Sequence, residues 1–247
     1  MKLSRFQKTA ISAVFWLGLW YLVSLKVGQN LILPGPLAVL KELIRLCGTP
    51  QFWISAAVTL LRIFGGFFFG LVFGAVFAVL TFKSEILDAI LTPMLRTMRA
   101  VPVASFIILA LLWINRQLVP GFVSSLIVMP VVWQALKTAI SETDGELLEM
   151  ARAYKFGKMR TLKYVYLPSV MPAFRACAFT ALGLSWKSGV AAEVLCLPKT
   201  AIGTQLYYSK IYLETPSLFA WTAVVVALSF LLEYALRGLF RERRDNL

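Results

Sequence analysis

Long apolar segments alternate with short polar segments along the whole chain. A helix needs about 20 mostly apolar residues to cross the hydrocarbon core of a membrane. Six segments approach that length: residues 9–27, 53–82, 94–114, 121–140, 169–194 and 217–236. We therefore predict an all-α membrane protein, a single domain over residues 1–247, in which six helices cross the bilayer.

Pairs of basic residues interrupt two of the six segments. The third reaches spanning length only if it begins near Met94 and carries Arg96 and Arg99 close to one membrane surface. The fifth is interrupted by Arg175 and Lys187.

The first segment follows the basic sequence MKLSRFQK, but no small-x-small cleavage site ends it. We interpret it as a retained span rather than a secretion signal.

The distribution of Lys and Arg predicts the orientation of the spans. Cytoplasmic loops of membrane proteins carry an excess of these two residues. If the N-terminus is placed inside, most of the 25 basic residues fall in cytoplasmic segments, from Lys2 through the loop at 142–168 to Arg243 and Arg244. We therefore expect both termini and this loop to lie in the cytoplasm.

Composition excludes several classes of function. The chain is 59% hydrophobic, whereas ordinary soluble domains are about 45–50% apolar. Its net charge of +13 flanks apolar segments instead of gathering on one soluble surface, which argues against nucleic-acid binding. The chain has no histidine, the commonest general base and metal ligand, and its three cysteines are widely spaced. We expect neither a metal site nor a cofactor.

The loop at 142–168 has the pattern of a docking element. It is acidic from Glu142 to Met150 and basic from Arg152 to Lys163, a distribution that suits a helix dipole. A helical face of apolar residues can pack into a groove on a partner. That face holds Leu147, Leu148, Ala151 and Tyr154. The alternative is an amphipathic helix that lies on the membrane and binds anionic lipid.

The same loop carries the motif E-A-A-x3-G-x9-I-x-L-P in a recognisable form. Glu149, Ala151, Val165, Leu167 and Pro168 fall at the expected offsets. In this respect the chain resembles the permeases of binding-protein-dependent ABC importers. The stretches ILPGPLAVLKEL, TLLRIFGGFFFG and MRAVPVASFIILALLWI are similar to those of the nitrate, sulfonate and taurine branch.

Two positions depart from the motif. Met150 replaces the first alanine, and Lys155 stands where the family has glycine. Because a residue with a side chain avoids a left-handed φ, we expect Gly157, two positions later, to form the turn after Phe156.

The resemblance implies the six-helix transmembrane domain of a type I ABC importer, in the cell membrane of a prokaryote. Its loop would form the coupling helix that docks in a cleft of the ATPase. The implied coupling residues are Glu149, Ala151, Tyr154, Lys155, Phe156, Gly157, Leu167 and Pro168. The implied partners are two ATPase copies, a second permease copy in a homodimer, an extracytoplasmic solute-binding protein and membrane lipid. The implied solute is a small anion such as a sulfonate, nitrate or taurine, although related importers carry other small solutes, including vitamin precursors.

The fifth span is where we expect a solute pathway. Trp186, Lys187, Ser188 and Glu193 place ionisable groups beside an apolar ring in or near the membrane. Such groups usually face protein or water rather than lipid. Lys187 would attract an anion in one interpretation; in the other it pairs with Glu193 or Glu233 or extends to the membrane surface.

The second span carries small residues at intervals of four. Gly66, Gly70 and Gly74 form this stripe, and Ala78 continues it. Small residues let helices approach closely in lipid, so we expect helix packing here. Arg62 is expected near the end of this span, with its charge extending to the membrane surface.

Two other classes of protein remain as alternatives. An ion-coupled secondary transporter would use intramembrane carboxylates and often inverted repeats. A membrane enzyme has little support, because the chain lacks clustered carboxylates and a G-x-S-x-G nucleophile motif. The chain also has no G-x4-G-K-[ST] motif, so as an importer subunit it would depend on a separate ATPase.

Overall fold

The computed structural model describes residues 5–241, and every regular element in this range is a helix, which confirms the all-α prediction. Lys2, Arg243 and Arg244, which entered the orientation argument, lie outside the described residues. The helices are α1 (Arg5–Val27), α2 (Pro36–Cys47), α3 (Pro50–Lys83), α4 (Glu85–Ala100), α5 (Val103–Ala110), α6 (Val119–Ser141), α7 (Gly145–Ala153), α8 (Lys158–Thr161), the π-helical segment η1 (Leu162–Tyr166), α9 (Leu167–Cys196), α10 (Ile202–Ile211) and α11 (Thr215–Arg241).

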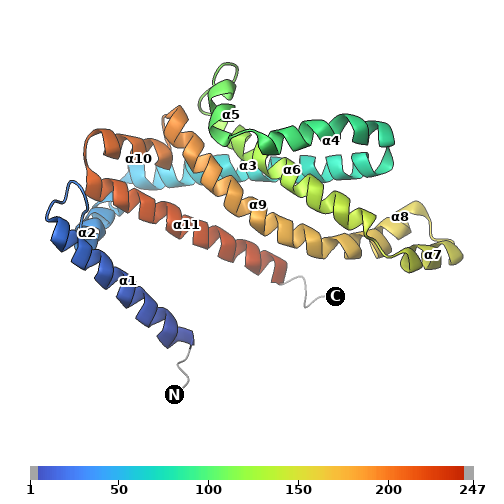
Figure 1. The fold of residues 1–247 in the computed structure, drawn as a ribbon, viewed down its shortest axis with the longest axis horizontal. Helices are drawn as coiled ribbons and strands as arrows, with labels where there is room; N and C mark the ends of the chain where they lie inside the picture. The colour runs from blue at the N-terminus through green and yellow to red at the C-terminus, as the bar shows by residue number, and fades with distance from the viewer. Residues whose placement is uncertain (1–4, 242–247) are drawn as a thin grey trace.

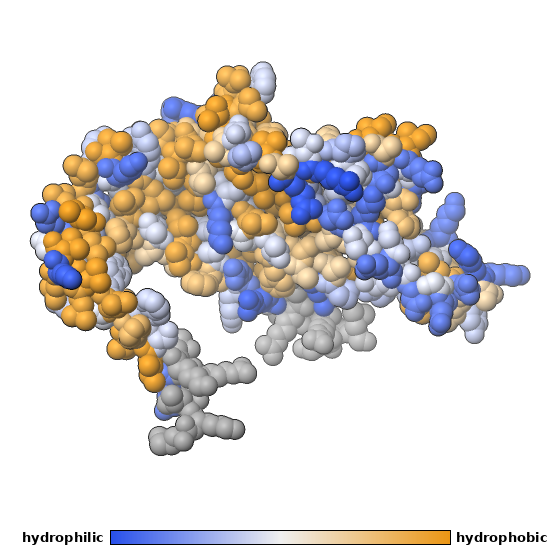
Figure 2. Space-filling view, viewed as in Figure 1, coloured by the Kyte–Doolittle hydropathy of each residue, from blue (hydrophilic) through white to orange (hydrophobic). Residues whose placement is uncertain are grey.

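The long helices α3, α6 and α9 pack together as the centre of the bundle (Figure 1). Helices α2 and α10 lie at one end of the molecule, and α7 and α8 lie at the opposite end (Figure 1). Helix α1 departs from the bundle, although Trp20 stacks on Phe219 of α11. Figure 2 shows hydrophilic residues gathered at the end that carries α7 and α8.

Glycines bring α3 into direct backbone contact with α6. A Cβ atom added to Gly66 would lie 2.0 Å from the carbonyl oxygen of Gly121. A Cβ at Gly70 would lie 2.6 Å from the Cβ of Val128, and Gly74 is equally close to the backbone of α6. These glycines therefore lie in the helix–helix interface, where any side chain would push the two helices apart.

Among the described residues, four helices are long and apolar enough to cross a membrane: Pro50–Lys83, Val119–Ser141, Lys158–Cys196 and Thr215–Gly238. The segment expected as the third span, residues 94–114, is not one straight helix. Helices α4 and α5 meet there at a bend of 104°. The break falls at Val101, whose ψ of 131° is extended because the following residue, Pro102, disfavours the helical conformation before it.

The helix of the fifth span begins earlier than expected. It runs without interruption from Lys158 to Cys196, whereas the sequence pattern placed its start at residue 169. Pro168 lies inside this helix, where it offers no N–H and its ring clashes with the preceding turn. The turn widens there: Leu167 N–H bonds the carbonyl of Leu162, five residues back, in the π-helical segment.

Candidate coupling segment and translocation face

The coupling segment, residues 144–166, stands at the end of the bundle where α6 ends and α9 begins. Asp144 caps α7, because its carboxylate accepts a hydrogen bond of 2.9 Å from the N–H of Glu146. Glu146 in the first turn and Arg152 in the last turn match the helix dipole. The sequence therefore starts and orients α7 with local interactions alone.

Lys155 adopts the left-handed conformation that terminates α7. Its φ is +54°, its N–H bonds the carbonyl of Arg152 at 2.9 Å, and the N–H of Phe156 bonds the carbonyl of Ala151 at 2.8 Å. This pair of bonds is a Schellman turn, which normally has glycine at the left-handed position. The expectation that Gly157 forms this turn is wrong: its φ is −68°, and it precedes α8 as the N-cap. The two capping bonds hold Lys155 in the conformation that its side chain disfavours.

The apolar residues of α7 do not form one face, as we had expected, but two. Leu148 and Ala151 turn toward the bundle, and Ala151 is only 2% exposed. Leu147, Met150 and Tyr154 lie on the outer side at spacings of three and four, and Tyr154 is 74% exposed. Ala151 is therefore a packing residue and not a surface for a partner. Met150, which was not among the predicted coupling residues, belongs to the outer face.

The other predicted coupling residues differ in exposure and in position. Glu149, Lys155 and Gly157 are exposed, whereas Phe156 is half-buried with its ring centroid 6.4 Å from that of Tyr164. Leu167 and Pro168 are also exposed, but they lie further along the chain, at the first turn of α9.

Only one of the four predicted pathway residues is exposed. Trp186 is buried and donates a 3.1 Å hydrogen bond to the carbonyl of Val225 on α11. Ser188 is buried and donates to the carbonyl of Leu184, and Glu193 is completely buried. The interpretation of Trp186 as an apolar pathway wall is therefore wrong for the monomer. Lys187 remains as the exposed member.

Lys187 lies on a continuous exposed face of α9. This translocation face consists of Ala176, Thr180, Leu184, Lys187 and Ala191. The spacing of three and four residues places them on one side of the helix. Lys187 precedes the end of α9 by nine positions, about 14 Å along a helix axis, which corresponds to roughly half of a hydrocarbon core.

Glu193 pairs with Arg62 and not with Lys187, the partner considered from the sequence. Nη1 of Arg62 on α3 donates to Glu193 at 2.6 Å, Thr59 donates at 2.9 Å, and the N–H of Gly203 donates at 3.2 Å. Among the described residues Lys187 forms no salt bridge, and Glu233 faces Arg237 instead. The suggested pairing of Lys187 with either glutamate is therefore wrong.

Arg62 does not extend to the membrane surface, as had been expected. Its side chain is 11% exposed and also contacts the side chain of Gln117 at 3.2 Å. Arg62 and Glu193 carry opposite charges on two predicted spans. Because charged residues inside a membrane usually pair with one another, the sequence could have indicated this ion pair. The pair joins α3 to α9 at the end of the bundle that carries α10.

Within residues 5–241, no three side chains of His, Cys, Asp or Glu form a group that would hold a metal ion. Cys47, Cys177 and Cys196 are all free thiols.

Comparison with known proteins identifies the family of this chain. The family model described as "Binding-protein-dependent transport system inner membrane component" matches residues 45–245. The taurine transport system permease protein TauC of Escherichia coli (strain K12) is 27% identical over 233 residues, which cover 90% of this chain and 82% of TauC. The aliphatic sulfonates transport permease protein SsuC of the same organism is 27% identical over 222 residues, which cover 89% of this chain and 80% of SsuC.

Solved structures share the fold. A chain of the MetNI methionine ABC transporter in an inward-facing conformation aligns with a TM-score of 0.64 at 20% identity, covering 79% of this chain and 98% of that one. A chain of a bacterial ABC transporter that imports the acidic polysaccharide alginate aligns with a TM-score of 0.68 at 14% identity, covering 95% of this chain and 94% of that one. The predicted type I importer fold is thereby confirmed. Since the family model spans most of the sequence, the chain belongs to the binding-protein-dependent transport system inner membrane components and is a membrane-embedded permease of an ABC importer.

Proposed function

We propose that this permease pairs with a second copy of itself and with two ATPase subunits to import a small anionic solute that an extracytoplasmic binding protein delivers. Both termini and the coupling segment face the cytoplasm in this proposal, and the end with α2 and α10 faces the binding protein. The observation that supports this proposal most directly is the exposed apolar stripe on α7, formed by Leu147, Met150 and Tyr154. The stripe lies outside the packed bundle.

The stripe fits a groove on a partner. Leu147, Met150 and Tyr154 present three apolar side chains along one helical side, as helices that dock in grooves do. Ala151 and the Schellman turn fix the helix against the bundle, so motion of the partner would be transmitted to α6 and α9. Closure of paired ATPases would then move the two permeases between inward- and outward-facing states.

The translocation face of α9 supports the homodimer and the charge of the solute. A lysine at the bilayer centre costs about 2.5–3.5 kcal/mol on insertion scales, so Lys187 is expected to face protein or water rather than lipid. A second copy packed near this face would enclose a path with one Lys187 from each side. TauC and SsuC are named for taurine and aliphatic sulfonates, which carry the negative sulfonate group that such a path would attract.

The test is purification of the tagged permease from its native membranes in mild detergent, followed by native mass spectrometry. We expect a complex of two permeases and two ATPases. Replacement of both Met150 and Tyr154 by alanine should remove the ATPase without unfolding the bundle, because aromatic anchors dominate protein interfaces. Tyr212→Ala is the matched control, since Tyr212 is also exposed but lies at the opposite end.

Two results would contradict the proposal. One is a permease that purifies folded without an ATPase and takes up solute only when an ion gradient is present. The other is an ATPase that stays bound to the Met150 and Tyr154 variant as tightly as to the wild type.

A further inference from the structure

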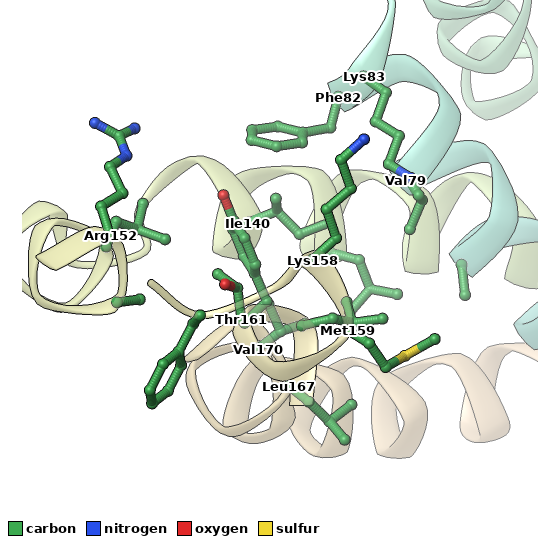
Figure 3. A pocket seen from close by; sticks show the side chains of 17 residues that line it. Val79, Phe82, Lys83, Ile140, Arg152, Lys158, Met159, Thr161, Leu167 and Val170 are labelled. Carbon is green, nitrogen blue, oxygen red and sulfur yellow. The ribbon is translucent and has the colours of Figure 1, made fainter. Parts of the chain in front are cut away.

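An open pocket lies beneath the coupling segment, between it and the ends of the long helices. Its volume is about 680 Å³, within the range of cavities that hold small-molecule ligands. Val79 of α3, Ile140 of α6 and Val170 of α9 form its apolar floor, and Leu162 and Tyr166 of the π-helical segment form one wall. Figure 3 shows Val79, Ile140 and Val170, from α3, α6 and α9, around one space.

Among the described residues, only basic ones supply charge to this pocket. Lys83, Arg152 and Lys158 line it, and no described Asp or Glu does. Within the described part of the chain, none of the three forms a salt bridge. In Figure 3, Lys83 of α3 and Lys158 of α8 extend along the same side of the pocket, while Arg152 points away. An anion held here would therefore meet two lysines from separate elements.

The position of the pocket determines which anion reaches it. Lys83 is the last residue of α3, and Lys158 is the first residue of the helix that continues as α9. Both lysines therefore stand at the ends of membrane-spanning helices, while Val79, Ile140 and Val170 lie on the sides of α3, α6 and α9 that line the pocket. Apolar walls below two cations match a molecule with an acyl chain and a negative headgroup.

We propose that this pocket binds one anionic phospholipid of the cytoplasmic leaflet, with its phosphate between Lys83 and Lys158 and an acyl chain against Val79 and Val170. This inference rests on the proposed orientation of the coupling segment. The bound lipid joins the end of α3 to α8. The ring contact between Phe82 and Tyr166, with centroids 6.3 Å apart, already brings α3 together with η1, the segment that follows α8. The lipid thereby holds the coupling segment in the position from which α7 meets the ATPase.

The binding test is native mass spectrometry of the permease–ATPase complex titrated with phosphatidylglycerol, phosphatidylcholine or inorganic phosphate. We expect selective retention of phosphatidylglycerol. Replacing both Lys83 and Lys158 by glutamine should weaken the affinity for phosphatidylglycerol by roughly 30-fold. Each basic residue near an anionic surface contributes a factor of about five to the binding constant. The matched control replaces both Arg160 and Lys163 by glutamine, which removes two charges from the same segment but outside the pocket.

A second variant tests the acyl-chain part of the site. Val79→Trp fills the floor and leaves both lysines in place, so phosphatidylglycerol retention should fall while thermal unfolding stays near that of the wild type. ATPase activity in nanodiscs should rise when phosphatidylglycerol is added to phosphatidylcholine, and this rise should be absent in the double lysine variant and present in the control.

Each contrary outcome has a distinct meaning. If the ATPase is bound and active but phosphatidylcholine is retained equally, or inorganic phosphate displaces the lipid, the lipid site is wrong and the proposed function stands. If ATPase binding expels the lipid, its role in coupling is wrong. If no ATPase associates, the titration is made on the permease alone, where lysine-dependent binding supports the lipid site and contradicts its role in coupling.

Discussion

The guanidinium of Arg62 on α3 lies 2.6 Å from the carboxylate of Glu193 on α9, and the two residues are separated by 131 positions in the chain. Glu193 is completely enclosed and also accepts hydrogen bonds from Thr59 and from the backbone of Gly203. This ion pair connects α3, α9 and the start of α10. The first prediction concerns its contribution to stability.

Replacing Glu193 by alanine should lower the free energy of unfolding by about 3–5 kcal/mol, because Arg62 would remain as a buried charge without its partner. Thermal unfolding of the detergent-purified permease measures the effect. Glu233→Ala is the control: that residue faces Arg237 at 3.9 Å in an exposed pair, for which less than about 1 kcal/mol is expected. Equal effects of the two substitutions would show that the buried pair has no special role.

Lys155→Gly should stabilise α7. The left-handed φ of +54° disfavours a residue with a Cβ by roughly 1 kcal/mol, and glycine removes that strain. Hydrogen exchange of the amides near the Schellman turn should therefore slow by about fivefold. Gly157→Ala serves as the control, because its φ is ordinary and a Cβ there meets nothing within 4 Å; it should leave exchange unchanged. Faster exchange in Lys155→Gly would contradict the strain argument.

Gly66→Ala should disrupt the contact between α3 and α6. The added methyl would lie 2.0 Å from a backbone oxygen of Gly121, which cannot move without shifting α6. Overpacking of this kind typically costs about 1–3 kcal/mol, and a backbone contact this short places Gly66→Ala at the upper end of that range. The neighbouring Gly65→Ala, where a Cβ meets nothing within 4 Å, should behave as the wild type. The measurement compares thermal unfolding and monodispersity of the two variants, and similar behaviour would exclude the close helix contact.

Lys187→Gln should reduce uptake of an anionic solute in reconstituted vesicles by about tenfold or more, since a hydrogen bond to a charged group contributes about 1.5–3 kcal/mol. Lys187→Ala and Lys187→Glu should abolish it, whereas Lys187→Arg should retain it. Membrane assembly should be unaffected in all four variants. Arg99→Gln, which removes an exposed basic residue from α4, is the control. Normal uptake by Lys187→Glu would remove Lys187 from the pathway.

Local features were the part of the fold that the sequence predicted well. The apolar segments predicted a helical membrane protein, because each long apolar run satisfies its own backbone hydrogen bonds as a helix. The glycine stripe at Gly66, Gly70 and Gly74 indicated a packing surface for the same local reason: only the absence of a side chain permits backbone contact. The motif around Glu149 and Pro168 indicated the family, and it marks the loop that we propose for coupling.

The relations between distant segments were decided only by the tertiary structure. Spacing along α9 could not show that Trp186 and Glu193 turn into the bundle while Lys187 turns out, because that depends on which sides α3, α6 and α11 cover. Likewise Lys155 is left-handed because two capping bonds and the packing of Ala151 outweigh the preference of its own side chain. The sequence by itself determined which segments are helices and which family they form. Only the packing of those helices against one another determined the partner of each charge, because ion pairs and exposed faces depend on atoms far apart in the chain.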